Sequence, residues 1–152
     1  MLQAVTWSSR GSLGRKRASE TGGDVINYVM VGSNRFDEAI AFYDALMEDM
    51  GATRVYATDK NVGWGWGIGT AMFVVTRPYD RREASIGNGS MVAFDVASPE
   101  LVDALHAKVL ALGGSNEGNP GPRGEHLYAG YWRDLDGNKF NFICYKQKSP
   151  AA

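Results

Sequence analysis

One pattern occurs twice in the sequence, and this repetition constrains the fold more than any other feature. Residues 26–51 read as a short alternating strand, a break and an amphipathic helix that ends at a glycine. Residues 90–113 repeat the same order, 62–63 residues later. A repeated unit of this kind is predicted to fold as two copies of one module, with one residue of slippage between them.

The helix of each copy has predicted boundaries. The first runs over about residues 35–50, with Asn34 as its N-cap and Gly51 just past its end. Apolar side chains recur along it at helical spacing, at Phe36, Ala39, Ile40, Tyr43, Leu46, Met47 and Met50. In the second copy Ser98, followed by a proline, is predicted to start the helix, and Gly113 to end it.

Two or three strands are expected after each helix. They lie at residues 54–58, 62–76 (two strands around a turn), 125–134 and 138–146. Asp136-Gly137 is a strong hairpin signal between the last two, and the polar loop at about 77–89 joins the copies. The predicted class is α+β, with two tandem βαβββ modules at about 25–80 and 90–146. These would form a cupped, roughly eight-stranded mixed sheet with helices on its outer face.

The 152 residues are predicted to form a single domain over residues 25–146. Residues 1–24 are rich in Ser, Gly and Arg and lack the apolar region of a secretory signal, so we expect a flexible or loosely docked tail. Residues 147–152 are expected to form a second short tail. The absence of any run of 18 apolar residues argues against a membrane span.

Charge and cysteine content exclude other classes. The net charge of −1 gives no basis for a nucleic-acid or acidic-membrane partner. Cys144 is the single cysteine, so no disulfide framework exists and a reducing, cytoplasmic location is expected. Because Cys144 lies in the apolar run FICY, we interpret it as a buried structural thiol rather than a nucleophile.

Three segments carry a family resemblance that covers about residues 25–146. They are INYVMVGSNRFDEAIAFYDALM, MVAFDVASPELVDALHAKVLALGG and YAGYWRDLDGNKFNF, in this order. The chain resembles the glyoxalase/bleomycin-resistance/extradiol-dioxygenase superfamily, also called vicinal oxygen chelate. The third segment is the most specific, although Leu135 stands where proline is common in the family. The resemblance implies two βαβββ modules around a cleft, a two-fold homodimer and, in many members, a divalent metal.

The resemblance also implies where the metal ligands would lie. Carried over to this sequence, the positions are Tyr28, Phe73, Met91 and Asn141, with Phe73 paired to Asn141 by aligning GTAMFVV with GNKFNFI. None is His, Glu or Asp. Phe73 cannot bind a metal, and the Met91 thioether is too soft for the metals that the family uses. Asn141 offers only a neutral carbonyl.

The two histidines do not repair this ligand set. His106 is expected on the flank of the second helix, outside the cup and partly exposed. His126 is predicted at a loop-to-strand junction next to Glu125, but adjacent strand residues point to opposite faces. The sequence therefore predicts a metal-free member of the superfamily with no cofactor, and it disfavours a divalent metal.

Aromatic and apolar side chains dominate the candidate cleft. The predicted ligand-binding residues are Tyr28, Trp64, Trp66, Phe73, Met91, Arg123, His126, Tyr128 and Asn141. Alternation places Asn141 on the cleft face between two helix-facing phenylalanines, although a one-residue slip would exchange the faces. Core packing explains Trp64 and Trp66 equally well, and the face taken by Tyr128 stays open.

Few polar groups accompany these aromatic residues. Arg123 could bind a carboxylate or phosphate at the mouth of the cleft, or remain a solvated loop residue. Arg77 and Tyr79, in the loop between the modules, have the same two interpretations. Asp95 could face the cleft and balance an arginine such as Arg123.

Three functions are compatible with this pattern. The first is a metal-free small-molecule-binding protein of the bleomycin-resistance type, which holds an aromatic or amphipathic ligand in the cup of a homodimer. The second is a lyase or isomerase of the lactoylglutathione lyase type, or a dioxygenase-related enzyme, with atypical metal ligation. The third is a non-catalytic structural or regulatory domain with a vestigial cleft. The missing His and Glu favour the first and third, and the aromatic cleft favours the first.

Overall fold

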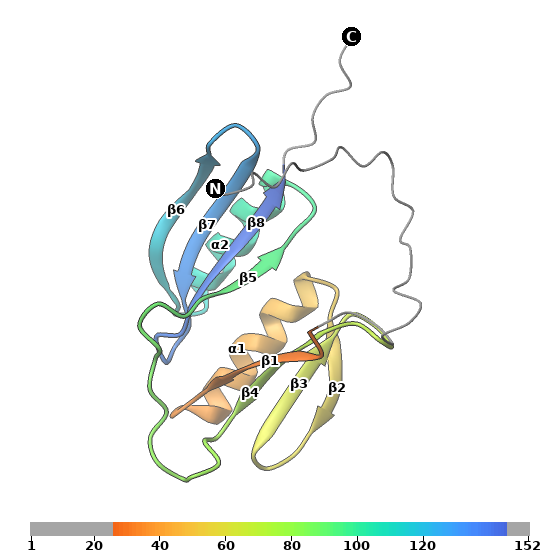
Figure 1. The fold of residues 1–152 in the computed structure, drawn as a ribbon, viewed down its shortest axis with the longest axis vertical. Coiled ribbons are helices and arrows are strands. Elements are labelled where there is room, and N and C mark those ends of the chain that lie inside the picture. The colour runs from red at the N-terminus through yellow and green to blue at the C-terminus, as the bar shows by residue number, and fades with distance from the viewer. Residues whose placement is uncertain (1–25, 146–152) are drawn as a thin grey trace, which may run out of the picture.

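The computed structural model describes residues 26–145, so both predicted tails lie outside the described range. The elements are β1 (Tyr28–Gly32), α1 (Phe36–Asp49), β2 (Thr53–Ala57), β3 (Asn61–Gly65), β4 (Met72–Thr76), β5 (Val92–Asp95), α2 (Pro99–Ala111), β6 (Ser115–Arg123), β7 (Leu127–Arg133) and β8 (Lys139–Tyr145) (Figure 1). Within this range, no helix has the length and apolar character to cross a membrane.

The eight strands form two four-stranded sheets of identical topology. Sheet 1 has the order β1-β4-β3-β2, and sheet 2 has the order β5-β8-β7-β6. β1 pairs in parallel with β4, and β5 pairs in parallel with β8, whereas all other neighbouring strands are antiparallel. The predicted α+β class with two tandem βαβββ modules is therefore confirmed. The strands make two separate sheets rather than one continuous sheet.

The helix ends match the prediction except at the start of α1. Ser98 accepts a 3.2 Å hydrogen bond from the Leu101 N–H, as an N-cap should. Gly51 and Gly113 have φ of +74° and +97°, the left-handed conformation expected after a helix. The predicted cap Asn34 is wrong: the N-cap is Arg35, with no side-chain cap, and Asn34 bonds to a distant loop instead.

A strand that the sequence did not predict, β6, includes Arg123, which was expected in a loop. β6 has the sequence SNEGNPGPR, with two prolines and two glycines, yet it pairs with β7. It is the edge strand of sheet 2, where a residue without an N–H is tolerated because its outer side needs no partner. Two register shifts interrupt the pairing, between Asn116 and Gly118 and between Gly118 and Gly121.

The helix-bearing faces of the two sheets share one hydrophobic core. The rings of Phe73 in sheet 1 and Phe140 in sheet 2 lie 5.8 Å apart, and Phe42 of α1 lies 6.1 Å from Trp132 of β7. In Figure 1, α1 accordingly lies on the side of sheet 1 that is nearer to sheet 2. Because the core joins the modules through these faces, the opposite, helix-free face of each sheet is not part of it.

Candidate functional site

A cleft of about 360 Å³ opens where the edge strands β1 and β5 approach each other. We call it the seam cleft, because one wall comes from each module. Its walls are largely apolar and include Val29, Met50, Trp66, Phe73, Phe94 and Asp95. A concave, mostly apolar surface with one charged group is the usual composition of a small-molecule site.

Trp66 is held in a fixed position at the rim of the seam cleft. Its indole N–H donates a 2.9 Å hydrogen bond to the backbone carbonyl of Met50, at the end of α1. Its ring lies 6.4 Å from that of Phe94, and the residue remains 40% exposed. The ring is therefore positioned before a ligand arrives and still has a free surface to offer.

Asp95 is the one charged residue in the lining of the seam cleft. It ends β5, and its carboxylate makes no hydrogen bond or ion pair with any residue in the 26–145 range. The expected pairing with Arg123 is absent: the Arg123 guanidinium donates to the carbonyls of Pro122 and Asn119. The Asp95 carboxylate is thus available to a cationic group of a ligand.

Trp64 does not line the seam cleft but belongs to the core, which is the second of the two interpretations that the sequence left open. Its side chain is 1% exposed in the shared core, and its indole N–H donates to Asp44 of α1 at 3.0 Å. The same carboxylate binds the Arg54 guanidinium, which is the first cause of the lowered pKa of Asp44. Trp64 therefore anchors β3 to α1.

Phe73 is also a core residue, although one edge of the seam cleft touches it. The predicted pairing of Phe73 with Asn141 is wrong by one residue. Val29 pairs with Phe73 in sheet 1, and Val92 pairs with Phe140 in sheet 2, so Phe140 is the equivalent of Phe73.

The equivalent of Asn141 is Val74, on the helix-free face of sheet 1. Neither Val74 nor Met72, its neighbour on that face, is a donor for a hard metal ion. Asn141 itself is 2% exposed, and its Oδ1 has no hydrogen-bond partner. Its cross-strand neighbours are Ala93 and Tyr131.

Tyr28 and Met91 lie near the seam but outside the lining of its cleft. Tyr28 is 52% exposed on the helix-free face of sheet 1, close to Tyr56. Burial raises the pKa of Tyr56, with a smaller contribution from the neighbouring Tyr28 hydroxyl. Met91 is 46% exposed and directly precedes β5.

The remaining predicted residues lie on sheet 2, away from the seam cleft. Tyr128 is on the helix-bearing face, where its hydroxyl donates to Asp103 of α2 at 2.8 Å, so it does not face a cup. The Arg123 guanidinium lies 5.3 Å from the centre of the Tyr131 ring. His126 is in the exposed turn between β6 and β7, 3.8 Å from Glu125.

The burial of His106 differs from the expectation for this residue. It is 4% exposed rather than partly exposed, and its Nε2 lies 3.0 Å from the carbonyl oxygen of Tyr131. A buried imidazole that contacts a backbone carbonyl between helix and sheet has a structural role. It remains outside any cleft, as expected.

The side chains do not fit the divalent metal that the fold family implies. In the part of the chain that the structure describes, no three His, Cys, Asp or Glu side chains lie close enough to hold a metal ion. At the expected positions the donors are a phenol, a thioether and an amide, on different sheets. Divalent metals of this class require imidazole or carboxylate ligands.

Apart from Trp66, Phe73 and Asp95, sequence patterns did not reveal the walls of the seam cleft. Val29, Met50 and Phe94 line it, although alternation and helical spacing assign all three to the core. They reach the cleft because they lie where two edge strands and the end of α1 converge. No local pattern in the sequence encodes that convergence.

Comparison with known proteins identifies the family. No protein-family model matches the chain, and no curated protein does. Among solved structures, a putative glyoxalase from Bacillus halodurans is 22% identical, with a TM-score of 0.67 over 80% of this chain and 96% of the other. A lactoylglutathione lyase from Agrobacterium tumefaciens is 20% identical, with a TM-score of 0.60 over 80% and 93% of the two chains. At these identities the likeness shows the fold alone.

A third solved structure is more similar in sequence. It is a glyoxalase/bleomycin resistance protein from Albidiferax ferrireducens, 37% identical, with a TM-score of 0.72. The match covers 78% of this chain and 97% of the other. Identity at this level over nearly the whole length of the relative, together with the duplicated βαβββ topology, shows that the chain belongs to the glyoxalase/bleomycin resistance protein family.

Proposed function

We propose that this protein binds a small molecule in the seam cleft without a metal ion. The observation that carries the proposal is the composition of the cleft: apolar walls, a positioned indole and one unpaired carboxylate. The ligand that fits this lining has an aromatic or other apolar body and a cationic group. Trp66 would stack on the body, and Asp95 would bind the cation.

The interactions proposed for the ligand support affinity rather than a reaction. Trp66 and Phe94 offer ring surfaces, and these gain energy from the burial of apolar area. Asp95 offers a charge, but no second titratable group lines the cleft to act as its acid or base partner. Binding or sequestration is therefore the function that this geometry supports best.

A thermal-shift screen of the full chain with matched ligand pairs tests the proposal. Each aromatic amine is compared with its neutral isostere, and only the amine should raise the Tm strongly. Asp95→Asn should abolish that difference, whereas Glu125→Gln, an equal charge change at an exposed turn, should preserve it. Ligand quenching of indole fluorescence should be lost in Trp66→Phe. Equal shifts for amine and isostere, or no hit at all, would refute the proposal.

We also propose that the protein is a homodimer. The helix-free face of sheet 1 exposes Tyr28, Met30 and Val55, which are 52%, 45% and 57% accessible. Adjacent exposed apolar side chains of this size indicate a contact surface. A second copy is the proposed occupant, because the duplicated fold presents a matching sheet in its other module and homo-oligomers usually close with two-fold symmetry.

A further inference from the structure

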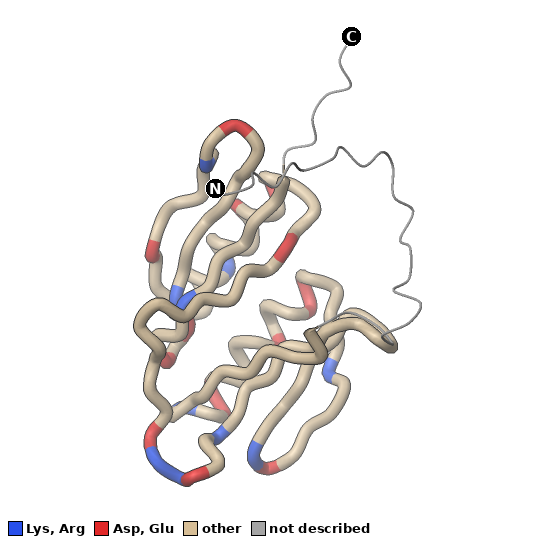
Figure 2. The backbone as a smooth tube through the Cα atoms, in the orientation of Figure 1, with Lys and Arg blue, Asp and Glu red and all other residues tan. Residues whose placement is uncertain are grey.

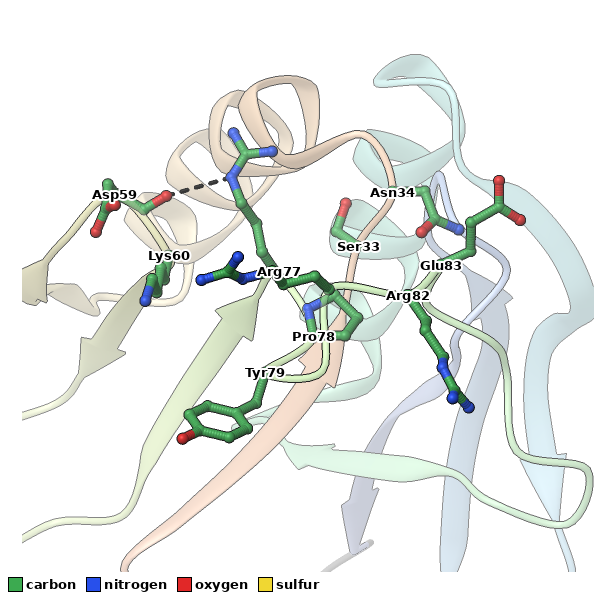
Figure 3. A pocket seen from close by; sticks show the side chains of 10 residues that line it. Ser33, Asn34, Asp59, Lys60, Arg77, Pro78, Tyr79, Arg82 and Glu83 are labelled. Atoms are coloured by element: carbon green, nitrogen blue, oxygen red, sulfur yellow. Dashed lines mark hydrogen bonds between the residues drawn. The ribbon is translucent and has the colours of Figure 1, made fainter.

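A second cavity, of about 540 Å³, lies at one end of sheet 1 and shares no lining residue with the seam cleft. Three segments enclose it: the β1–α1 turn with Ser33 and Asn34, the β2–β3 turn with Asp59 and Lys60, and the loop 77–83 after β4 (Figure 3). We call it the loop pocket. Figure 2 shows charged residues gathered at the loops of this end, whereas the strands between are mostly uncharged.

Cationic side chains outnumber acidic ones in the loop pocket. The charged lining residues are Lys60, Arg77, Arg81, Arg82, Asp59 and Glu83. Within residues 26–145, the Lys60 ammonium and the Arg81 guanidinium make no hydrogen bond or ion pair. The Arg82 guanidinium has one weak ion pair, with its Nε 3.9 Å from the Asp80 carboxylate. Unpaired cations that converge on a concave surface attract an anion.

Arg77 fixes the back of the loop pocket. Its guanidinium stacks 4.3 Å from the centre of the Phe36 ring. Its Nε donates to the backbone carbonyl of Asp59 at 3.2 Å, and its Nη2 lies 3.5 Å from Asp37. These contacts hold its charge in place and leave the anion-binding donors to Lys60 and Arg81.

The loop that carries most of these residues is held in a defined conformation. The Asn34 side chain donates to the Ala84 carbonyl at 2.9 Å and accepts from the Ala84 N–H at 2.6 Å. Within the loop, the Arg81 N–H donates to the Pro78 carbonyl at 3.1 Å. A loop fixed in this way loses little entropy when a ligand binds. This role also explains why Asn34 does not cap α1.

Arg81 adopts a strained backbone conformation. Its φ is +63°, and among the described residues it is the only one other than glycine with a positive φ. Glycine takes this conformation at lower cost, and the sequence uses glycine at seven such positions. Strain of this kind persists where a particular side chain is needed. Its place in the lining of the loop pocket makes the Arg81 guanidinium a candidate ligand-binding group.

Tyr79 provides a surface for an aromatic group. It is 99% exposed and belongs to the lining of the loop pocket. Figure 3 shows Tyr79 on the same side of the loop as Lys60, whereas Arg82 and the Glu83 carboxylate point to the other side. An exposed tyrosine beside cations can stack on a flat ring whose phosphate groups bind those cations.

We propose that the loop pocket binds a nucleotide-like small molecule. Lys60 and Arg81 bind its phosphate groups, and Tyr79 stacks on its aromatic ring. Guanidinium and ammonium groups are well suited to phosphate, and two of them match a group with two negative charges. The site is separate from the proposed ligand site in the seam cleft.

Calorimetric titration of the full chain at low salt with ADP, pyrophosphate and adenosine tests this inference. ADP should bind more tightly than pyrophosphate, and adenosine should not saturate. Lys60→Ala combined with Arg81→Gly should weaken ADP binding by about tenfold or more, since two charge-assisted bonds are lost. Tyr79→Ala should weaken ADP but not pyrophosphate. Arg123→Ala, which removes one cation outside the pocket, should change neither.

The single variant Arg81→Gly separates function from folding. It should raise the Tm of the ligand-free protein, because glycine relieves the backbone strain, and it should reduce the shift that ADP produces. Absence of ADP binding at millimolar concentration would overturn the inference. So would unchanged affinity in the Lys60→Ala/Arg81→Gly variant with a native circular dichroism spectrum.

Discussion

The Tyr43 hydroxyl on α1 donates a 2.7 Å hydrogen bond to Asp134, 91 residues later and in the other module. Both residues are buried, at 1% and 6% exposed. Asp134 also accepts from the N–H groups of Asp136 and Asn138, at 3.0 and 2.9 Å, and from the Asn138 side chain at 2.9 Å. The Asp134 carboxylate thereby attaches the β7–β8 hairpin to the first module, in addition to the bonds that Asp136 and Asn138 make with the end of β1 and the turn after it.

Tyr43→Phe should destabilise the protein by about 1–3 kcal/mol, because a buried carboxylate loses a donor and no water replaces it. Chemical denaturation followed by circular dichroism measures this loss. Tyr128→Phe is the matched control: it also removes one phenol–carboxylate bond, but at an exposed site where water can replace the hydroxyl. A loss in Tyr128→Phe as large as that in Tyr43→Phe would contradict this account.

The same pair predicts a pH dependence. Burial is the main cause of the raised pKa of Asp134, and the hydrogen bonds from Asn138 and Tyr43 partly offset it. The native state therefore holds the proton more tightly than the unfolded state. The contribution of Asp134 to stability is fully present when the pH is below 3.8, the ordinary pKa of an aspartate. It is lost as the pH rises through the raised pKa of the native state.

Because the Tyr43 bond lowers the pKa of Asp134, its removal raises that pKa further. The stability difference between wild type and Tyr43→Phe should then shrink as pH falls from neutral towards the Asp range. The wild type and the variant must be compared with each other, because the lowered pKa of Asp44 makes the stability of both proteins fall over the same acid range. Denaturation curves at several pH values give the difference, and a constant difference would be evidence against the prediction.

Local patterns were sufficient to predict the modules, three of the four helix ends and the last hairpin. Gly137, for example, has φ of +90° and donates to the Asp134 carbonyl at 3.1 Å, as a tight turn requires. Periodicity and turn chemistry act over a few residues, so they can be recognised in a single sequence. They also correctly separate Asn141 from its two phenylalanine neighbours, which lie in the core.

The faces of the GWGWG segment were not predictable in the same way. The glycines suggested free space around the tryptophans, but the space is used from the opposite face of sheet 1. A Cβ added to Gly63 would lie 2.6 Å from the Tyr56 ring, and one added to Gly65 would lie 3.1 Å from Val55. Glycine is required because β2 packs its side chains over β3. This packing depends on the pairing of strands, which residue spacing does not show.

Asn141→Leu should stabilise the protein by about 1–3 kcal/mol, because it removes a buried amide oxygen with no partner and keeps a similar volume. The midpoint of chemical denaturation measures the change. Asn138→Leu is the opposing control: Asn138 donates to the Gly32 carbonyl at 3.1 Å as well as to Asp134, so its loss should destabilise. If Asn141→Leu also destabilised, the amide oxygen would have a partner in solution.

Asn141→Glu should not create a metal site. The new carboxylate would have Ala93 and Tyr131 as its cross-strand neighbours, and neither supplies a His, Cys, Asp or Glu ligand. Metal analysis of the purified variant, after incubation with Zn²⁺ or Mn²⁺ and gel filtration, should find no stoichiometric ion. The variant should also lose stability, since it buries a charge. One bound ion per chain would contradict the prediction, because it would show that other side chains complete a metal site around residue 141.

Tyr28→Asp combined with Met30→Asp should convert the proposed dimer into a monomer. Both side chains project from β1 on the helix-free face of sheet 1, and both are about half exposed in one chain. Two charges placed in an apolar contact surface oppose its desolvation. Light scattering after gel filtration gives the mass, and circular dichroism checks the fold. Tyr79→Ala, which alters an equally prominent aromatic residue outside that face, should leave the mass unchanged. A wild-type protein that is monomeric at every concentration tested would rule out the dimer.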